Sequence, residues 1–171
     1  GGKQITNALN RLKLRTKFVN GLRYTGKKSI KIVEKVLRRI NRQMVYELQH
    51  YGIKAISLSC KDNNTIIARR IKNLGYVGKI KKVNLKLLEL LLNKDFIPVV
   101  LPVGSDGKGT TLNLNADTVA TELSIALKAY KLIFLTDVPG IIDRNGEIIH
   151  KVDSKQISSL INKKIVAGGM I

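Results

Sequence analysis

Two adjacent glycines, Gly1 and Gly2, stand directly before residues whose spacing predicts a short amphipathic helix, with Ile5 and Leu9 on its apolar face. The first N–H groups of a helix have no intrahelical partner and lie at the positive end of the helix dipole, so they bind anions. Glycines also let a ligand approach the backbone closely. The pair therefore indicates an anion site, with an ordinary turn as the alternative.

An arginine ends the loop of residues 20–23, Asn-Gly-Leu-Arg. The guanidinium of Arg23 can form a two-pronged pair with a carboxylate. The chain holds 31 Lys and Arg residues against 12 Asp and Glu, so a solvated surface arginine is the alternative. Arg23 is thus a candidate ligand for an anionic group.

Residues 113–117, Asn-Leu-Asn-Ala-Asp, lie between a predicted strand and a predicted helix. Asn113 and Asp117 are four residues apart, so on a first helical turn they would share one face. An amide there can donate to a substrate oxygen, and a carboxylate can hold a lysine in place. The alternative is a plain cap by Asn115 with Asp117 favoured by the helix dipole, which leaves Asn113 without a role.

Residues 136–140, Thr-Asp-Val-Pro-Gly, directly follow the apolar run 131–135, which predicts a buried strand. A polar loop at the carboxyl end of a parallel strand is where α/β folds bind ligands, and a plain turn is the alternative. Residues 168–171 are a glycine pair followed by apolar residues, as though a helix were about to begin. No spacing of ligand residues predicts a metal site, and we assign no role to His50, His150 or Cys60.

Helices and strands must position these residues, and the periodicity of apolar side chains predicts both. Thr25 or Ser29 is expected to cap the long basic helix, and Pro98 and Pro102 are expected at strand ends or bulges. Strands that alternate with helices imply an α/β fold whose mainly parallel sheet is covered on both faces. The predicted helices are 1–12, 29–52, 84–92, 116–129 and 154–162, and the predicted strands are 55–59, 65–68, 76–83, 96–103, 110–112, 131–135 and a hairpin of 141–142 with 148–149.

The net charge of +19 attracts polyanions, so a basic α/β module that binds nucleic acid is the rival function. The basic residues of helix 29–48 mostly face away from its apolar side, where any soluble helix carries charge. Only 5% of residues are aromatic, and they do not cluster as single-strand binding requires. Nucleic acid is therefore the less favoured partner. The longest apolar run, 96–103, is far too short to span a membrane.

In their order and spacing, the motifs resemble the amino acid kinase family over the whole chain. The resemblance implies a three-layer α/β sandwich with a mainly parallel central sheet. The Asn-Gly-Leu-Arg loop favours the branch that phosphorylates the side-chain carboxylate of N-acetyl-L-glutamate in arginine biosynthesis, and another member of the family is the alternative. The matching residues are 1–5, 18–23, 78, 83–84, 97–100, 113–117, 135–140 and 168–171.

The resemblance also implies a role for each matching residue. ATP with Mg²⁺ would donate its γ-phosphoryl group, and the product would be an acyl phosphate. Gly1 and Gly2 would hold the carboxylate and phosphoryl region, while Arg23 would bind the substrate's α-carboxylate. Asn113 would contact the substrate, and Asp117 would organise two catalytic lysines. The nucleotide site would be lined by Thr136, Asp137, Val138, Gly140, Gly168, Gly169 and Met170.

The family pattern places both lysines outside residues 1–171, and the chain does not begin with Met. We therefore expect an internal piece that does not catalyse at a normal rate by itself. Residues 1–128 are expected to form the lobe that binds the amino acid and dimerises, and 129–171 to begin the nucleotide lobe. Helix 29–48 resembles the family's dimer-forming helix, so a homodimer or larger homo-oligomer is expected. The PII signalling protein is a partner by analogy only, and the expected location is the cytoplasm or the plastid stroma, without membrane association.

Overall fold

The computed structural model describes residues 1–136, 140–143 and 145–162. They belong to two compact units, of which the first comprises Gly1–Val19 and Arg23–Leu132. The second comprises Asn20–Leu22 and the described residues from Ile133 onward. The functional division into lobes at residue 128 stays a prediction.

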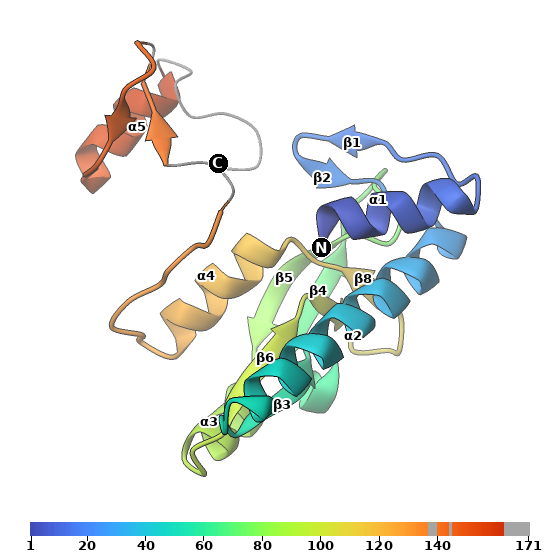
Figure 1. Cartoon of the computed structure of the whole chain (residues 1–171). Helices are drawn as coiled ribbons and strands as arrows, with labels where there is room; N and C mark the ends of the chain where they lie inside the picture. The colour runs from blue at the N-terminus through green and yellow to red at the C-terminus, as the bar shows by residue number, and fades with distance from the viewer. Residues whose placement is uncertain (137–139, 144, 163–171) are drawn as a thin grey trace. The chain divides into compact units, whose positions relative to one another are not determined.

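The first unit alternates helices with short strands (Figure 1). Its elements are α1 (Gly2–Arg11), β1 (Phe18–Val19), β2 (Leu22–Arg23, of which Leu22 is grouped with the second unit), α2 (Lys27–His50), β3 (Ala55–Ser59), the 3₁₀ turn η1 (Asp62–Asn64), β4 (Ile66–Arg70), β5 (Gly78–Val83), α3 (Lys86–Leu92), β6 (Ile97–Leu101), β7 (Val103–Ser105), β8 (Thr111–Asn113) and α4 (Ala116–Ala126). The second unit holds β9 (Ile141–Ile142), β10 (Ile148–Ile149) and α5 (Ser154–Asn162).

The strands of the first unit form separate sheets that contain both parallel and antiparallel pairs. β3 pairs in parallel with β6, from Ala55 beside Ile97 to Ser59 beside Leu101. A second group has the order β5-β4-β7-β8, in which β4 and β7 are parallel while β5 and β8 are antiparallel to their neighbours. Pro102 separates β6 from β7, as expected of a residue that cannot donate to a ladder, whereas Pro98 lies within β6 beside Ile56 and not at the strand end or bulge that was predicted. The predicted α/β class is confirmed.

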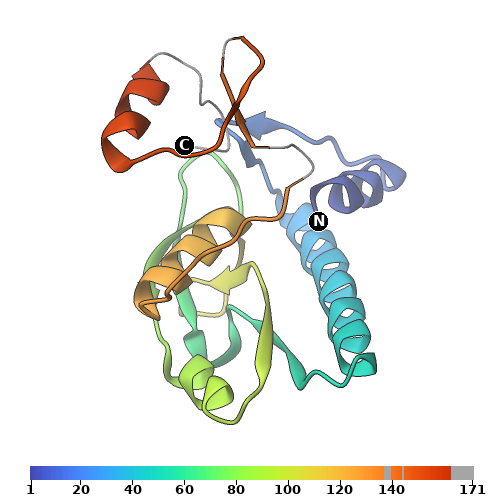
Figure 2. The same ribbon diagram turned by 60° about the vertical axis from the view of Figure 1, so that its left-hand side comes forward.

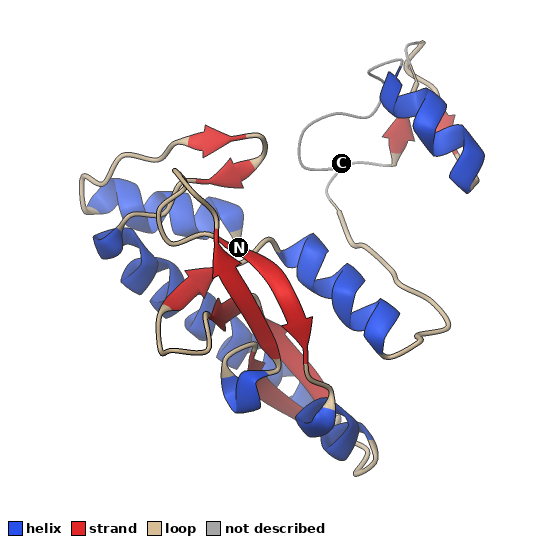
Figure 3. Cartoon of the chain, turned by 180° about the vertical axis from the view of Figure 1, so that it is seen from behind, coloured by secondary structure: helices blue, strands red, loops and turns tan. Residues whose placement is uncertain are grey.

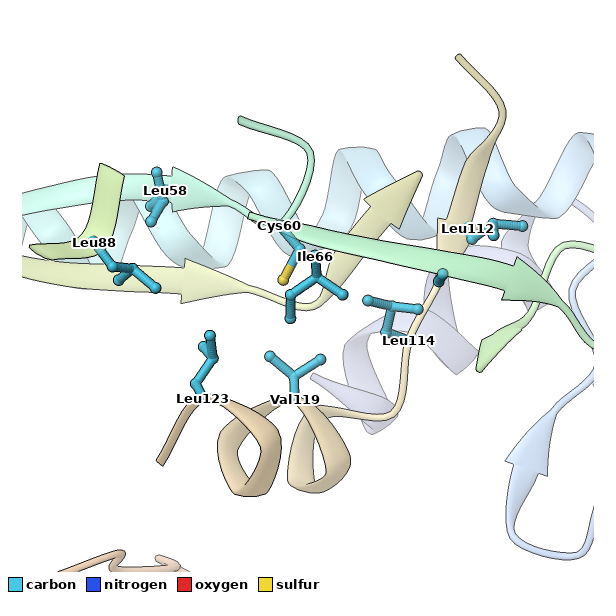
Figure 4. Packing of buried hydrophobic residues seen from close by; sticks show 9 residues of the cluster. Leu58, Cys60, Ile66, Leu88, Leu112, Leu114, Val119 and Leu123 are labelled. Carbon is cyan, nitrogen blue, oxygen red and sulfur yellow. The ribbon is translucent and has the colours of Figure 1, made fainter. Parts of the chain in front are cut away.

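Helices cover both faces of these strands, which gives the expected three layers. α2 lies on one side, and α3 and α4 lie on the other (Figures 1, 2 and 3). Between the sheet and α4, the side chains of Val119 and Leu123 point toward the apolar residues of the strands and of α3 (Figure 4). The buried members of this core are Leu58, Cys60, Ile66, Ala68, Leu88, Leu112, Leu114, Val119 and Leu123.

Helix α1 packs on α2 through a second apolar cluster. Ile5 and Leu9 of α1, four residues apart and therefore on one face, meet Val33 and Val36 of α2. This cluster holds α1 against α2. Cys60 is a fully buried core side chain, and burial raises the pKa of its thiol to about 12, which favours the neutral thiol over the reactive thiolate.

Two predictions about the elements are wrong. Neither Thr25 nor Ser29 caps α2, whose N-cap is Gly26, because the Thr25 hydroxyl is engaged elsewhere. Residues 131–135 do not form a buried strand: Ile133 is 69% exposed and Leu135 is 96% exposed. A buried strand needs neighbouring strands for its backbone groups, and no described strand pairs with this run.

Candidate functional site

A tight hairpin of β1 and β2 brings Arg23 back toward the start of the chain. Asn20 and Gly21 take positive φ angles of 47° and 75°, the geometry of a two-residue hairpin turn. The Tyr24 N–H donates to the Lys17 carbonyl at 2.8 Å and closes the hairpin. Asparagine and glycine tolerate these angles better than other residues, so the loop sequence itself specifies the turn.

Arg23 is a buried cation and not the solvated surface arginine that its basic context allowed. It is 8% exposed, and its Nη2 donates to the Gly2 carbonyl at 3.1 Å and to the Thr6 Oγ1 at 2.9 Å. Its Cζ lies 4.5 Å from the centre of the Phe18 ring. Its buried Nη1 has no partner among the described residues, and burial lowers the pKa of the guanidinium. A buried guanidinium with an unused donor matches an incoming carboxylate.

Thr25 connects Arg23 to Asn113. Its fully buried hydroxyl donates to the Arg23 carbonyl at 2.9 Å and accepts from the Asn113 Nδ2 at 3.2 Å. Three of the predicted binding residues, Gly2, Arg23 and Asn113, are therefore joined through hydrogen bonds although they come from α1, β2 and β8.

Asp117 and Asn113 do not share a helical face, so that part of the prediction is wrong. Asn113 is the last residue of β8, and α4 begins only at Ala116. The Asn115 side chain caps α4 by accepting from the Thr118 N–H at 2.8 Å, which makes the strand-to-helix boundary sharp. Asp117 is exposed on the first turn of α4, and no hydrogen bond or ion pair joins its carboxylate to another described residue.

The predicted helix after the glycine pair is present, with Gly1 at the N-cap position and Gly2 as the first residue of α1. Both glycines are exposed. The beginnings of α1 and α4 lie on the same side of the first unit in all three views (Figures 1, 2 and 3). Two helix N-termini and one buried guanidinium thus contribute positive charge on this side, while the exposed Asp117 in the first turn of α4 contributes a negative one.

The predicted nucleotide-binding residues lie in the second unit or outside the described residues. Asp137, Val138, Gly168, Gly169 and Met170 are outside the described residues. Thr136 is exposed, and Gly140 precedes β9. Residues 131–135 do not form a strand, so this loop does not lie at the carboxyl end of one, which corrects the prediction.

Two contacts of the site were not predicted. Thr6 lies four residues after Gly2, on the same helix face, so the spacing of the first turn could have identified it. Thr25 was considered only as a helix cap, and no local pattern points to its partner in β8. In the described ranges, no group of three His, Cys, Asp or Glu side chains could hold a metal ion, and no helix is long and apolar enough to cross a membrane.

A family model described as the amino acid kinase family matches residues 1–171. The acetylglutamate kinase of Endomicrobium trichonymphae is 41% identical over the whole chain, which covers 69% of that protein. That of Pseudothermotoga lettingae is 44% identical, and the chain again matches along its full length and covers 62% of the relative. The chain therefore spans about two thirds of the length of these relatives.

Solved structures share the arrangement of elements. The crystal structure of smu.665 from Streptococcus mutans UA159 is 30% identical, with a TM-score of 0.90 over 99% of this chain and 70% of the other. N-acetylglutamate synthase from Neisseria gonorrhoeae, complexed with coenzyme A and N-acetyl-glutamate, is 22% identical. Its TM-score of 0.80, over 92% of this chain and 37% of that one, shows a common fold.

Proposed function

Because the chain belongs to the amino acid kinase family, we propose that the protein transfers the γ-phosphoryl group of ATP to the side-chain carboxylate of N-acetyl-L-glutamate. The relatives named acetylglutamate kinase support this choice of substrate. The product is an acyl phosphate, and the step belongs to arginine biosynthesis. The observation that carries the proposal is the unpaired, buried Nη1 of Arg23.

Arg23 is proposed to bind the α-carboxylate of the substrate. Leaving a buried donor unpaired costs about 1–3 kcal/mol, and a carboxylate removes that cost while neutralising the buried charge. The Nη2 contacts to Gly2 and Thr6 hold the guanidinium in place, so Nη1 is presented in a fixed direction. Such preorganisation is what amino acid recognition requires.

The reacting end of the substrate is proposed to lie at the beginnings of α1 and α4. The amides of Gly1 and Gly2 would hold the carboxylate and the phosphoryl group, and Asn113 would contact the substrate. Asp117, exposed at the start of α4, would organise two lysines that the family pattern places outside residues 1–171. A carboxylate already ionised at neutral pH needs no general base, so positioning and neutralisation of charge suffice.

MgATP is proposed as the second substrate. Thr136, Asp137, Val138 and Gly140 would line its site together with Gly168, Gly169 and Met170. Mg²⁺ would arrive bound largely to the ATP phosphates, which is how kinases commonly bind it.

A homodimer that includes α2 is part of the proposal. Met44 and Tyr46 of α2 are 51% and 67% exposed, and they provide apolar surface that a second copy could cover. The PII signalling protein remains a partner proposed by analogy, and the cytoplasm or the plastid stroma remains the proposed location.

The test compares residues 1–171 with a version extended at both ends to the length of the relatives. We expect the extended protein to form an acyl phosphate, trapped as a hydroxamate, from N-acetyl-L-glutamate and MgATP, and the 171 residues alone to form none at a normal rate. L-Aspartate, L-glutamate, carbamate and UMP serve as alternative acceptors, with ADP formation as the readout, because phosphorylated UMP is not an acyl phosphate and is not trapped as a hydroxamate. Turnover of one of these in place of N-acetyl-L-glutamate would contradict the proposed substrate.

A second arm addresses nucleic acid. Titration with single-stranded and duplex RNA at physiological salt is expected to give weak binding that falls steeply with salt. Tight, salt-resistant RNA binding without kinase activity would favour the rival function.

A further inference from the structure

The hydroxyl of Thr25 fixes the orientation of the Asn113 amide. A hydroxyl has one proton, and that of Thr25 is donated to the Arg23 carbonyl. The oxygen can therefore only accept from Asn113, which turns the amide Nδ2 toward Thr25 and the Oδ1 away from it. The same hydroxyl thus sets the backbone of one proposed substrate residue and the side chain of another.

The backbone of Thr25 is itself held on both sides. Its N–H donates to the Leu74 carbonyl at 3.2 Å, and its carbonyl accepts from the Tyr76 N–H at 2.6 Å. The Tyr76 carbonyl in turn accepts from the Asn113 N–H at 2.8 Å. Gly75 lies between Leu74 and Tyr76 and has a φ of 71°. A Cβ at this position would lie 2.3 Å from the Thr25 carbonyl oxygen, so only glycine permits the close approach of the two backbones.

We infer that Thr25 is a positioning residue: by fixing Arg23 and Asn113 relative to each other, it sets the affinity for the amino acid substrate. This inference rests on the proposed function. Thr25 is fully buried, so it acts through its two neighbours and does not touch the substrate. Its hydrogen bonds cross between β2 and β8, and no hydrogen bond joins the described side chains of Arg23 and Asn113 directly.

The test removes the hydroxyl without changing the shape of the side chain. Thr25→Val is compared with Thr25→Ser, which keeps the hydroxyl, in the extended protein. Thr65→Val is the matched control, because Thr65 is equally buried and its hydroxyl also donates to a backbone carbonyl, that of Asp62, but it contacts no proposed substrate residue. Calorimetry gives the dissociation constants for N-acetyl-L-glutamate and for a non-hydrolysable ATP analogue, and thermal unfolding gives the stability of each variant.

We expect Thr25→Val to weaken binding of N-acetyl-L-glutamate roughly ten-fold, the scale of one or two lost hydrogen bonds, with the affinity for the ATP analogue unchanged. Thr25→Ser should bind N-acetyl-L-glutamate as the unaltered protein does. Thr65→Val should be less stable but keep its affinity for N-acetyl-L-glutamate. If Thr25→Val does not fold, Thr25→Cys, whose thiol is a weak donor and acceptor, replaces it with the same expectation.

Unchanged affinity for N-acetyl-L-glutamate in the hydroxyl-free variant would overturn the inference while leaving the proposed function intact. Equal weakening for both ligands would also overturn it, since that is what general loss of structure produces. An unaltered extended protein that neither binds nor phosphorylates N-acetyl-L-glutamate would overturn the proposed function, and this inference with it.

Discussion

Arg23 shows how burial changes the meaning of a residue. The same side chain would be one of many cations on the surface of this basic chain, yet it lies under the Phe18 ring with one nitrogen unused. Desolvation makes an unsatisfied donor costly, so the site favours a ligand that supplies the missing acceptor. The chemistry at this scale therefore follows from the environment of the guanidinium and not from its charge alone.

Replacing Arg23 by lysine tests that environment. An ammonium keeps the charge but cannot bridge Gly2 and Thr6 while presenting a second N–H in a fixed direction. We expect Arg23→Lys to weaken N-acetyl-L-glutamate binding by roughly 1.5–3 kcal/mol in calorimetry of the extended protein. Arg42→Lys, on the exposed face of α2, is the control and should bind normally. Equal affinities for the two variants would show that charge alone suffices.

Replacing Gly75 by alanine tests the close approach to Thr25. The new Cβ would collide with backbone, and a positive φ adds strain, so we expect Gly75→Ala to lower the free energy of unfolding by roughly 2–4 kcal/mol in urea titrations. Gly52→Ala is the matched control, because Gly52 has a φ of 76° but no atom within 4 Å of its Cβ position. Gly52→Ala should lower the free energy of unfolding by only about 1 kcal/mol. Similar losses would mean that the loop moves to admit the methyl group.

At the scale of elements, the carboxylate of Glu34 connects α2 through Lys61 to β8. The Glu34 Oε1 accepts from the Arg38 Nη2 at 2.9 Å and from the Lys61 Nζ at 3.0 Å. The same Lys61 Nζ donates to the Thr111 Oγ1 of β8 at 3.1 Å. Lys61 lies two residues after the end of β3, and Thr111 is the first residue of β8, so this cluster links the long helix to the strand that ends in Asn113.

The pH dependence of stability tests this link. Burial raises the pKa of the Glu34 carboxyl, but hydrogen bonds and charges of Lys61 and Arg38 outweigh it, and the net pKa is lowered. A lowered pKa contributes stability that is present above the ordinary value of about 4.3 and is lost as the pH falls through the lower folded value. We expect the unfolding free energy to fall less steeply below about pH 4.3 in Glu34→Gln than in the unaltered chain.

The control for this experiment is Glu47→Gln, at an exposed position of the same helix. It should leave the acid slope of the unaltered chain in place. The unfolding free energy is measured by chemical denaturation between pH 3 and pH 7. If it depends on pH in the same way in both variants, the ion cluster does not stabilise the fold.

At the scale of the whole molecule, the exposed apolar side chains of α2 bear on assembly. If α2 lies in a homodimer interface, a charge at the 67% exposed Tyr46 places a carboxylate against apolar surface. We expect the extended protein to sediment as a dimer or larger oligomer and Tyr46→Glu to shift it toward monomer. Leu90→Glu in α3 is the control, because Leu90 is also largely exposed, at 56%. This variant should remain oligomeric. Identical sedimentation of both variants would place the interface elsewhere.

Local pattern was enough to predict most of the first unit. The apolar periodicity identified α1, α2, α3 and α4 and the strand 55–59 with its observed bounds, because side-chain burial on one face repeats with the geometry of each element. It failed for 131–135, whose apolar composition is typical of a buried strand but which has no described strand beside it. Strand formation depends on a partner that composition cannot reveal.

The sequence alone was enough to identify the family from the order and spacing of its short motifs. Each of these motifs marks the end of a helix or strand that this fold needs. Only the tertiary structure decided that Arg23 is buried with an unused donor, that Asn113 belongs to a strand and not to the helix of Asp117, and that Thr25 joins β2 to β8. Hydrogen bonds between residues far apart in the chain depend on how layers pack, and that packing leaves no periodic trace in the residues it brings together.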